Sequence, residues 1–289
     1  MKTRSFYRWQ PSAWLKISGE DAATFLQGQF TNDLRKTEGI HPGVYGLWLN
    51  QKGKVLADSF VLGVEGGAFW VGSYFSPAAV IRERLEAYVI ADDVVIEDET
   101  PHWAGVTVYG EAALPDGVVR VGARRGVEPA VEWMFPAADA PRVLAALAGG
   151  SELNAADMER RRISGGVPAV PADIGPTELP NEGGLDATAI SYTKGCYLGQ
   201  EVMARLKSLG QVRRRLVRVT GTGPVPARGT LLYQGAQKVG EIRTTAVNGQ
   251  GYLGLALVTL LNLQRDAGLS LAPDAPATLQ LSEPAELSP

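Results

Sequence analysis

Residues 192–206 read YTKGCYLGQEVMARL and contain Cys196, the only cysteine of the 289-residue chain. Glycine on each side of it, at Gly195 and Gly199, allows the backbone to bend tightly around the thiol. From Gln200 onward the residues are good helix formers, so we expect Cys196 at or just before a helix N-terminus. The stretch therefore predicts a loop that presents a cysteine at the start of a helix.

The surroundings of Cys196 favour the thiolate form of the side chain. A helix N-terminus carries about half a positive charge, and Lys194 lies two residues before the cysteine. An electropositive setting of this kind makes a thiol a nucleophile or a redox-active group. The alternative is a small buried side chain, which is the commoner fate of a free cysteine. No histidine lies nearby in the sequence to form a Cys–His pair, so the residues alone leave both interpretations open.

The residues before this stretch predict an α+β unit. Residues 19–34 read GEDAATFLQGQFTNDL, with Asp21 as a helix N-cap and apolar side chains at helical spacing. The segments VYGLWLN and VLADSFVLGV flank the turn QKGK and predict a hairpin, and AFWVGS predicts a further strand. Pro77 opens a helix, and VVIEDE predicts a strand after it. The order helix, three strands, helix, strand indicates a largely antiparallel sheet.

The next hundred residues repeat this pattern more weakly. WAGVTVYG, VVRVGARR and AVEWMFP predict strands, Pro141 begins a short helix, and Asn154 caps the helix AADMERRRIS. Residues 167–191 are proline-rich and lack periodicity, so we expect a long functional loop or a lid there. After Gln211, short strands separated by Gly, Pro and Asn turns predict a small β-barrel or sandwich.

These patterns predict the domain organisation. Residues 1–100 form the first α+β domain, and residues 101–210 form a second one that carries the cysteine and can be interleaved with the first. Residues 211–283 form the C-terminal β-barrel, and residues 284–289 form a disordered tail.

Composition excludes several classes of protein. The net charge of −3 argues against direct nucleic-acid binding, which requires a basic surface. The arginine runs 160–162 and 213–215 are interpreted first as solvated faces; the alternative is that one of them faces a polyanionic ligand such as a polyglutamate tail. With one cysteine and only His41 and His102, the chain predicts no zinc or iron–sulfur cage of its own.

A single cysteine also excludes an intramolecular disulfide and fits a reducing compartment. The N-terminus has no apolar core of signal-peptide length, and no run reaches the ~18 apolar residues needed to span a bilayer. We therefore expect a cytoplasmic protein without a membrane partner.

The motif KGCYLGQE resembles the signature of the YgfZ family, a branch of the glycine-cleavage T-protein (GcvT-like aminomethyltransferase) superfamily. The family pattern is Lys-Gly-Cys-aromatic-x-Gly-Gln-Glu, and the matching residues are Lys194, Gly195, Cys196, Tyr197, Gly199, Gln200 and Glu201. The segments GEDAATFLQGQFTNDL, LNQKGKVLAD, GGVP and LPNEGGL agree with the family in the same order. The resemblance covers about residues 15–260.

The resemblance implies an α+β fold in which two antiparallel-sheet domains and a small C-terminal β-barrel form a ring around a central cavity. It also implies that this cavity binds tetrahydrofolate, or a one-carbon-substituted or polyglutamylated folate. T-protein relatives bind the pterin with a carboxylate, a role that falls to Glu182 here, where two parallel hydrogen bonds can form. The expected folate contacts are Glu182, Asn32, Asp33, Tyr45, Trp48, Gln200 and Arg205. Helix capping and core packing are the alternatives for Asn32, Asp33 and the segment from Tyr45 to Trp48.

One departure from the T-protein pattern bears on activity. The superfamily's transferases use an aspartate just after the strand that corresponds to AFWVGS, whereas residues 74–78 here contain no carboxylate. Aminomethyl transfer would lack its acid/base group, although Asp58 of the hairpin could take the position.

Three hypotheses follow. The first is a folate-dependent accessory factor for iron–sulfur cluster assembly or repair, with Cys196 and Lys194 as the reactive centre and client or assembly proteins as partners. The second is a tetrahydrofolate-dependent aminomethyltransferase or demethylase. The third is a docking module with a vestigial folate pocket. A functional Cys196 and ligand-induced stabilisation by folate separate the first from the third.

Overall fold

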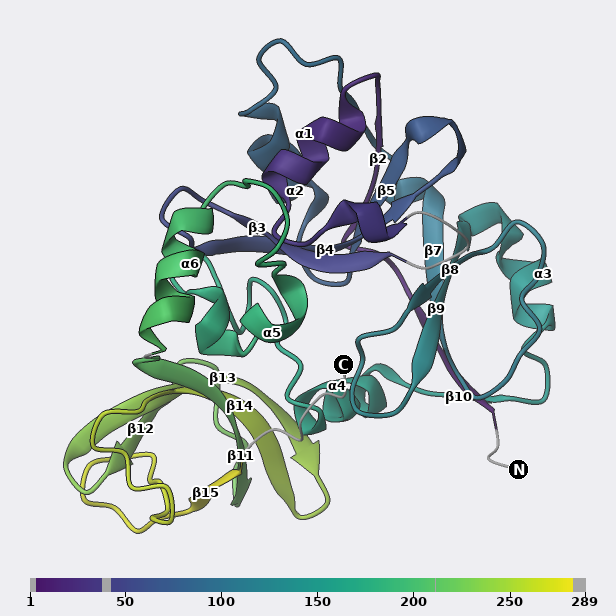
Figure 1. The fold of residues 1–289 in the computed structure, drawn as a ribbon. Helices are drawn as coiled ribbons and strands as arrows, with labels where there is room; N and C mark the ends of the chain where they lie inside the picture. The colour runs from purple at the N-terminus through teal and green to yellow at the C-terminus, as the bar shows by residue number, and fades with distance from the viewer. Residues whose placement is uncertain (1–3, 38–42, 211, 283–289) are drawn as a thin grey trace.

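The computed structural model describes residues 4–37, 43–210 and 212–282, which form three five-stranded sheets around a common centre (Figure 1). The expected fold class, two α+β units and a C-terminal β unit, is confirmed. His41 and the predicted tail of residues 284–289 lie outside the described residues. No helix in the described part of the chain is both long and apolar enough to cross a membrane.

The first sheet has the strand order β3–β4–β5–β2–β6 and is antiparallel throughout. Its strands are β2 (Ala13–Ser18), β3 (Val44–Leu49), β4 (Val55–Gly63), β5 (Phe69–Ser73) and β6 (Val95–Asp98). Helices α1 (Ala22–Gln29) and α2 (Ala78–Glu86) cover one face, where Phe25, Leu26, Ile81 and Leu85 are buried. Apolar side chains at helical spacing thus pack on the sheet as the sequence predicts.

The sequence patterns did not predict two strands that lie before Gly19. The strand β1 (Ser5–Trp9) pairs with the second sheet, and β2 lies between β5 and β6 in the first. Four of the six residues of β2 are fully buried, and alternation of apolar and polar residues is limited to residues 15–18. The N-terminal residues therefore belong to both α+β units.

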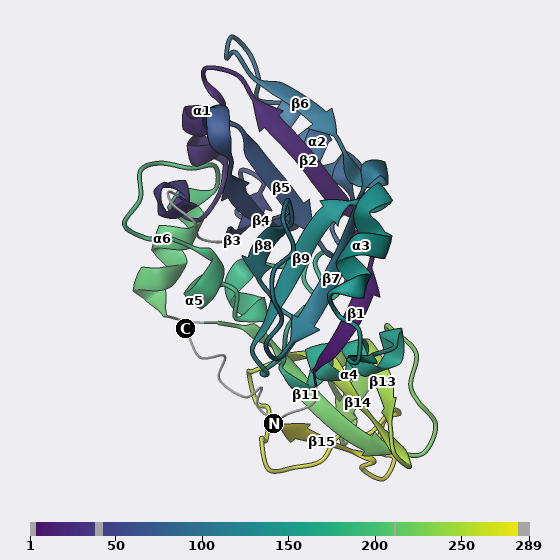
Figure 2. The ribbon, with the colours of Figure 1, turned by 90° about the vertical axis from the view of Figure 1, so that its right-hand side faces the viewer.

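The second sheet has the order β10–β1–β7–β9–β8, and only its β1–β10 pair is parallel. Besides β1, its strands are β7 (Trp103–Tyr109), β8 (Val119–Gly122), β9 (Ala130–Pro136) and β10 (Ser151–Glu152). Helix α3 (Ala140–Ala145) lies beside this sheet (Figure 2). Its Val143 packs in one apolar cluster with Trp133 and Phe135 of β9. This unit contains the three strands that the sequence predicts between residues 103 and 136.

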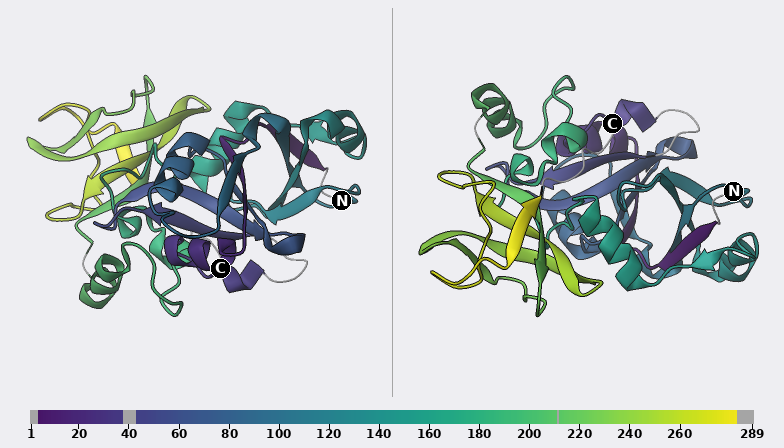
Figure 3. Two further views of the ribbon diagram at one scale, coloured as in Figure 1. Left: turned by 90° about the horizontal axis from the view of Figure 1, so that it is seen from above. Right: turned by 90° about the horizontal axis from the view of Figure 1, so that it is seen from below.

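The third sheet has the order β12–β13–β14–β11–β15 and is antiparallel. Its strands are β11 (Arg214–Thr222), β12 (Leu231–Gln234), β13 (Gln237–Asn248), β14 (Gly251–Thr259) and β15 (Leu279–Ser282). The sheet curls around its own apolar cluster, which includes Val219, Leu232 and Val258 (Figure 3). The C-terminal β unit predicted from short strands and turns is therefore present.

The segment between the second and third sheets connects the units of the fold. Helix α4 (Ala155–Ser164) begins with a capping box in which the Asn154 side chain accepts from the Asp157 N–H, as the sequence predicts. The following residues include the 3-10 turn η5 (Pro180–Gly183), α5 (Asp186–Ala189) and α6 (Gln200–Leu209).

The prediction of a loop or lid over residues 167–191 is wrong in one respect. Val170, Ile174, Leu185 and Ile190 are buried, because they pack between the first and third sheets. We call this apolar group the central cluster; it comprises Leu47, Leu49, Val55, Ile163, Val170, Ile174, Leu185, Ala189, Ile190, Tyr197, Met203, Leu216, Leu253, Leu255 and Leu257. The segment is thus part of the core and cannot open as a lid without exposing it.

Candidate functional site

Cys196 is exposed and lies four residues before α6. The next side chain, Tyr197, is buried in the central cluster and fixes the backbone beside the thiol. Gly199 has φ 86°, and a Cβ there would lie 2.9 Å from the Asn50 carbonyl oxygen. The position therefore requires glycine for its conformation and for its space. The predicted placement of the cysteine just before a helix is confirmed.

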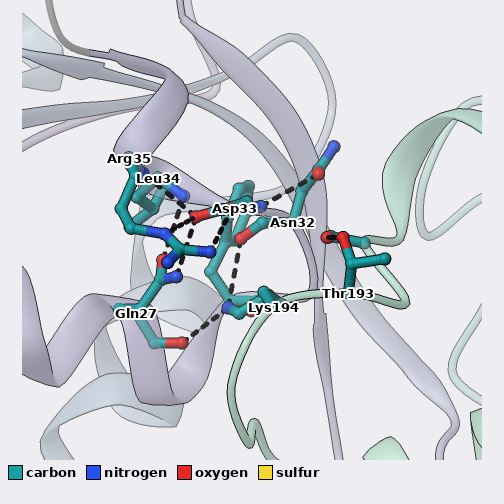
Figure 4. A network of polar contacts seen from close by, with 9 residues as sticks. Gln27, Asn32, Asp33, Leu34, Arg35, Thr193 and Lys194 are labelled. Atoms are coloured by element: carbon teal, nitrogen blue, oxygen red, sulfur yellow. Dashed lines mark hydrogen bonds and ion pairs between the residues drawn. The ribbon is translucent and has the colours of Figure 1, made fainter.

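Lys194 anchors the cysteine loop to the first unit (Figure 4). Its buried ammonium donates to the carbonyl oxygens of Gln27 and Phe30 at 2.6 Å and of Asn32 at 3.1 Å. The first two carbonyls lie at the C-terminal end of α1, where a helix carries partial negative charge. Burial lowers the pKa of Lys194 to about 8. The side chain therefore anchors the loop to α1, and its effect on the Cys196 thiolate stays a prediction.

Backbone and hydroxyl contacts fix the loop on both sides of Cys196. The Ser191 N–H donates to the Thr31 carbonyl at 3.0 Å, and the Thr31 hydroxyl donates to the Ala189 carbonyl at 2.7 Å. Beyond the cysteine, the Leu198 N–H donates to the Gly28 carbonyl at 3.3 Å. The thiol is thus carried on a short segment whose two ends are both attached to residues 28–31.

Asn32 and Asp33 shape the turn that receives the loop. The Asn32 amide donates to the carbonyls of Tyr45 at 2.8 Å and Thr188 at 3.3 Å. Asp33 accepts from the Arg35 guanidinium at 2.7 Å and from the Gln27 amide at 2.9 Å, and the bond to Arg35 holds the pKa of this carboxyl well below its usual range. Both side chains therefore have structural partners, the alternative that the sequence left open.

Tyr45 and Trp48 face different environments although both come from β3. Trp48 is fully buried, donates to the Ser59 hydroxyl at 2.8 Å and packs on Phe30, so it fills the core. The Tyr45 hydroxyl donates to Asp58 at 2.9 Å, and the Arg124 guanidinium lies 3.9 Å from the centre of the Tyr45 ring. Only Tyr45 is connected to the cavity described below.

Asp58 lies against the segment where T-protein transferases have their aspartate. Its carboxylate accepts from the hydroxyls of Ser73 and Ser76, both at 2.7 Å, and from Tyr45. Burial raises the pKa of Asp58. The three hydroxyl donors stabilise a buried charge that would otherwise be costly. The carboxylate oxygens of Asp58 therefore already accept hydrogen bonds in the folded protein.

The Glu182 carboxylate also accepts hydrogen bonds from within the protein. It is buried at the end of η5, where its two oxygens accept from the Arg214 guanidinium at 2.8 and 3.2 Å. One of these oxygens also accepts from the Leu179 N–H at 2.7 Å. A carboxylate offers about four lone-pair sites, so one remains. The ion pair ties the loop to β11 of the third sheet.

The remaining predicted residues lie apart from this group. Gln200 is half-buried at the start of α6, and Arg205 is exposed on the same helix. In the first arginine run, each side chain pairs with an acid: Arg160 with Asp157, Arg161 with Glu128, and Arg162 with Glu159 and Asp173. Among the described residues, no group of three or more His, Cys, Asp and Glu side chains could hold a metal ion.

A cavity of about 410 Å³ lies where the loop after η5 meets the second and third sheets. One wall is formed by Gly183, Gly184, Leu185, Ala187 and Thr188. Arg124 forms another, and Arg215, Leu216 and Val217 of β11 form a third. Its lining contains none of the predicted folate contacts, but Gly183 follows Glu182 and Arg124 stacks on Tyr45. No pattern in the sequence indicated Arg124, because an arginine pair at the end of a predicted strand is typical of a solvated strand end.

Replacing Lys194 by methionine tests the anchoring role. We expect Lys194→Met to lower the free energy of unfolding by about 2–4 kcal/mol, because each buried carbonyl left without a donor costs about 1–3 kcal/mol. Protection of the Ser191 and Leu198 amides from hydrogen exchange should fall at the same time. Lys52→Met, at an exposed turn position, is the matched control. Unchanged stability and protection in Lys194→Met would refute the anchor.

The chain has clear relatives. Residues 11–114 match the GCVT N-terminal domain family, and residues 213–288 match the CAF17 C-terminal beta-barrel domain family. The human mitochondrial iron–sulfur cluster assembly factor IBA57 is 31% identical over 273 residues, which cover 84% of this chain and 74% of that protein. The tRNA-modifying protein YgfZ of Klebsiella pneumoniae is 28% identical over 233 residues, or 74% of this chain and 71% of that one.

The fold comparison agrees. The crystal structure of the glycine cleavage system aminomethyltransferase T from Bartonella henselae superposes with a TM-score of 0.77, covering 92% of this chain and 81% of that one at 14% identity. The three sheets, the C-terminal β unit and the sequence matches give one result: the chain belongs to the family of YgfZ and the IBA57 iron–sulfur cluster assembly factors, built on the GcvT fold.

Proposed function

We propose that the protein assists the assembly or repair of iron–sulfur clusters in other proteins, binding tetrahydrofolate and using Cys196 as its working group. The observation that carries the proposal is the presentation of Cys196: an exposed thiol on a segment that buried contacts hold on both sides. Core packing does not explain these contacts, because an exposed side chain is not part of the core. The names of the IBA57 relatives place this chain's family in iron–sulfur cluster assembly.

One thiolate can supply one ligand to a cluster that needs several. Because the described residues form no metal-binding group of their own, the other ligands must come from a client or assembly protein. The cluster, or an intermediate of it, is then cargo shared between two chains. The exposed position of Cys196 is what such sharing requires.

Two observations support tetrahydrofolate as the ligand of this cavity. The cavity of about 410 Å³ is within the size range of small-molecule sites. Two buried polar atoms have no hydrogen-bond partner among the described residues: Nε of Arg124, which lines the cavity, and Oδ1 of Asn181, two residues before Gly183 in its wall. Arg124, Tyr45 and Glu182 are the residues that would hold the ligand, Glu182 through its remaining lone-pair site. The bound folate would supply one-carbon or reducing chemistry.

Aminomethyl transfer is the second candidate, and Asp58 is the observation that bears on it. The carboxylate lies beside residues 73–76, as a replacement for the missing aspartate would. Yet it is buried, does not line the cavity and accepts from three hydroxyls. Asp58 therefore positions Tyr45 and the residues after β5, and transfer chemistry has less support than the thiol function.

Cys196 variants test the proposal directly. Cys196→Ala and Cys196→Ser should fold with stability within about 0.5 kcal/mol of the parent, because the side chain is exposed. Both should fail to restore iron–sulfur enzyme activity in cells that lack their own family member. Thr193→Ala, at an exposed position of the same loop, should restore it fully. Full rescue by both cysteine variants would overturn the role of the thiol.

Glu182→Gln tests the folate contact. Losing a charge-assisted hydrogen bond should weaken tetrahydrofolate binding by about 1–3 kcal/mol, measured by titration calorimetry under reducing conditions. Because Glu182 also pairs with Arg214, thermal unfolding of the variant must be recorded in parallel. Lower stability with unchanged folate affinity would assign Glu182 to the Arg214 pair alone.

A further inference from the structure

Arg84 of α2 is buried and takes part in no ion pair within the described part of the chain. Its side chain is 7% exposed, and burial lowers the pKa of the guanidinium. The Nη2 atom is also buried and has no hydrogen-bond partner among the described residues. Burying a charge without a carboxylate partner is costly. An apolar side chain of similar length would fill the same space without this cost, so packing does not explain the residue.

The hydrogen bonds of Arg84 join the ends of two elements. Its Nε donates to the Leu49 carbonyl oxygen at 2.9 Å, and its Nη1 donates to the Gln29 side-chain oxygen at 2.9 Å. Leu49 is the last residue of β3, and Gln29 is the last residue of α1. The guanidinium also lies 4.4 Å from the centre of the Tyr88 ring, which supports it from its face. One planar group therefore fixes the end of α1 relative to the end of β3.

The same two ends receive the loop that carries Cys196. At the end of α1, the Gly28 carbonyl accepts from the Leu198 N–H at 3.3 Å. At the end of β3, a Cβ placed on Gly199 would lie 3.3 Å from the Leu49 Cβ, so the loop backbone packs directly on this strand. We call the residues that receive the loop the loop platform: Gly28, Gln29, Phe30, Leu49 and Asn50.

Cys196 lies between two attachments to the loop platform. Before it, the Lys194 ammonium donates to the Phe30 carbonyl at 2.6 Å, and after it, Leu198 donates to Gly28. Figure 1 shows α1 and α2 on one side of the first sheet and α6, which follows the cysteine loop, on the other. The place of the thiol therefore depends on how the end of α1 is held against the end of β3.

We propose that Arg84 is a positioning residue for Cys196: its guanidinium fixes the loop platform, and the platform fixes the loop that presents the thiol. The assignment rests on the proposed function of Cys196 and names a residue on which that function depends. A guanidinium suits this role because its N–H donors point in fixed directions and reach two acceptors at once. A working group must be held to within about 0.5 Å by the contacts that support it. Arg84 is the supporting contact that lies farthest from the exposed thiol in sequence.

Hydrogen exchange of the Leu198 amide measures how firmly the loop is attached to the platform. Arg84→Met keeps an apolar stem and removes the donors, so this amide should exchange about tenfold faster, the scale of one lost charge-assisted hydrogen bond. Arg84→Lys keeps a cationic donor and should recover part of the protection. Gln29→Ala removes one acceptor, should act in the same direction, and gives an answer even where Arg84→Met does not fold. Combined with Arg84→Met it should add nothing, because the two changes remove the same contact.

Two control variants separate this effect from charge and from overall stability. Arg82→Met removes an exposed arginine of α2 that pairs with Glu86, and Val143→Ala removes a buried side chain from the core of the second unit. Neither should change the exchange of the Leu198 amide selectively. In cells that lack their own family member, Arg84→Met should restore less iron–sulfur enzyme activity than the parent at equal protein level.

Three results would overturn the assignment. The first is unchanged Leu198 exchange in both Arg84→Met and Gln29→Ala. The second is faster exchange in Arg84→Lys than in Arg84→Met, which would assign the residue to packing. The third is full rescue by Arg84→Met in cells where both Cys196 variants fail. Failure of the proposed function gives a different result: both Cys196 variants restore activity fully while Arg84→Met still loosens the loop. Arg84 would then position the loop, and the thiol would have no part in cluster assembly.

Discussion

The structure depends on one apolar cluster that the first and third sheets share with the segment between them. Leu47 and Leu49 come from the first sheet, Leu255 comes from the third, and Ile174 and Leu185 come from the segment between them. Side chains of this size contribute about 1.5–3 kcal/mol each when they are fully buried. Because the segment from residue 167 to residue 199 fills the centre, it fixes the position of the cysteine loop, of Glu182 and of the cavity wall together.

Polar contacts then attach this packed segment to the first and third units. Lys194 joins the cysteine loop to the end of α1, and the Glu182–Arg214 pair joins the same segment to the third sheet. Between these two attachments lie an exposed thiol and a cavity bordered by arginine. The exposed thiol is open to a partner, and under the proposed function a folate would bind in the cavity.

Much of the fold follows from sequence patterns, and most side-chain roles do not. Helix α6 begins at Gln200 and α4 is capped by Asn154, as local propensity and capping predict. The sequence patterns did not indicate β2, because its first three residues are all buried and the alternation of apolar and polar residues is limited to residues 15–18. The roles of Lys194 and Arg124 depend on carbonyls and rings that are distant in sequence, so no local pattern could indicate them. For the same reason Trp48, expected near a ligand, lies in the core.

Thermal unfolding of the purified protein with and without tetrahydrofolate, under anaerobic and reducing conditions, tests the central claim most directly. A ligand that binds only the folded state adds about 2.7 kcal/mol of stability at 100 times its dissociation constant. For a chain of this size the account predicts a rise of several degrees in the midpoint. No shift at millimolar tetrahydrofolate would contradict it and would leave a docking module with a vestigial pocket.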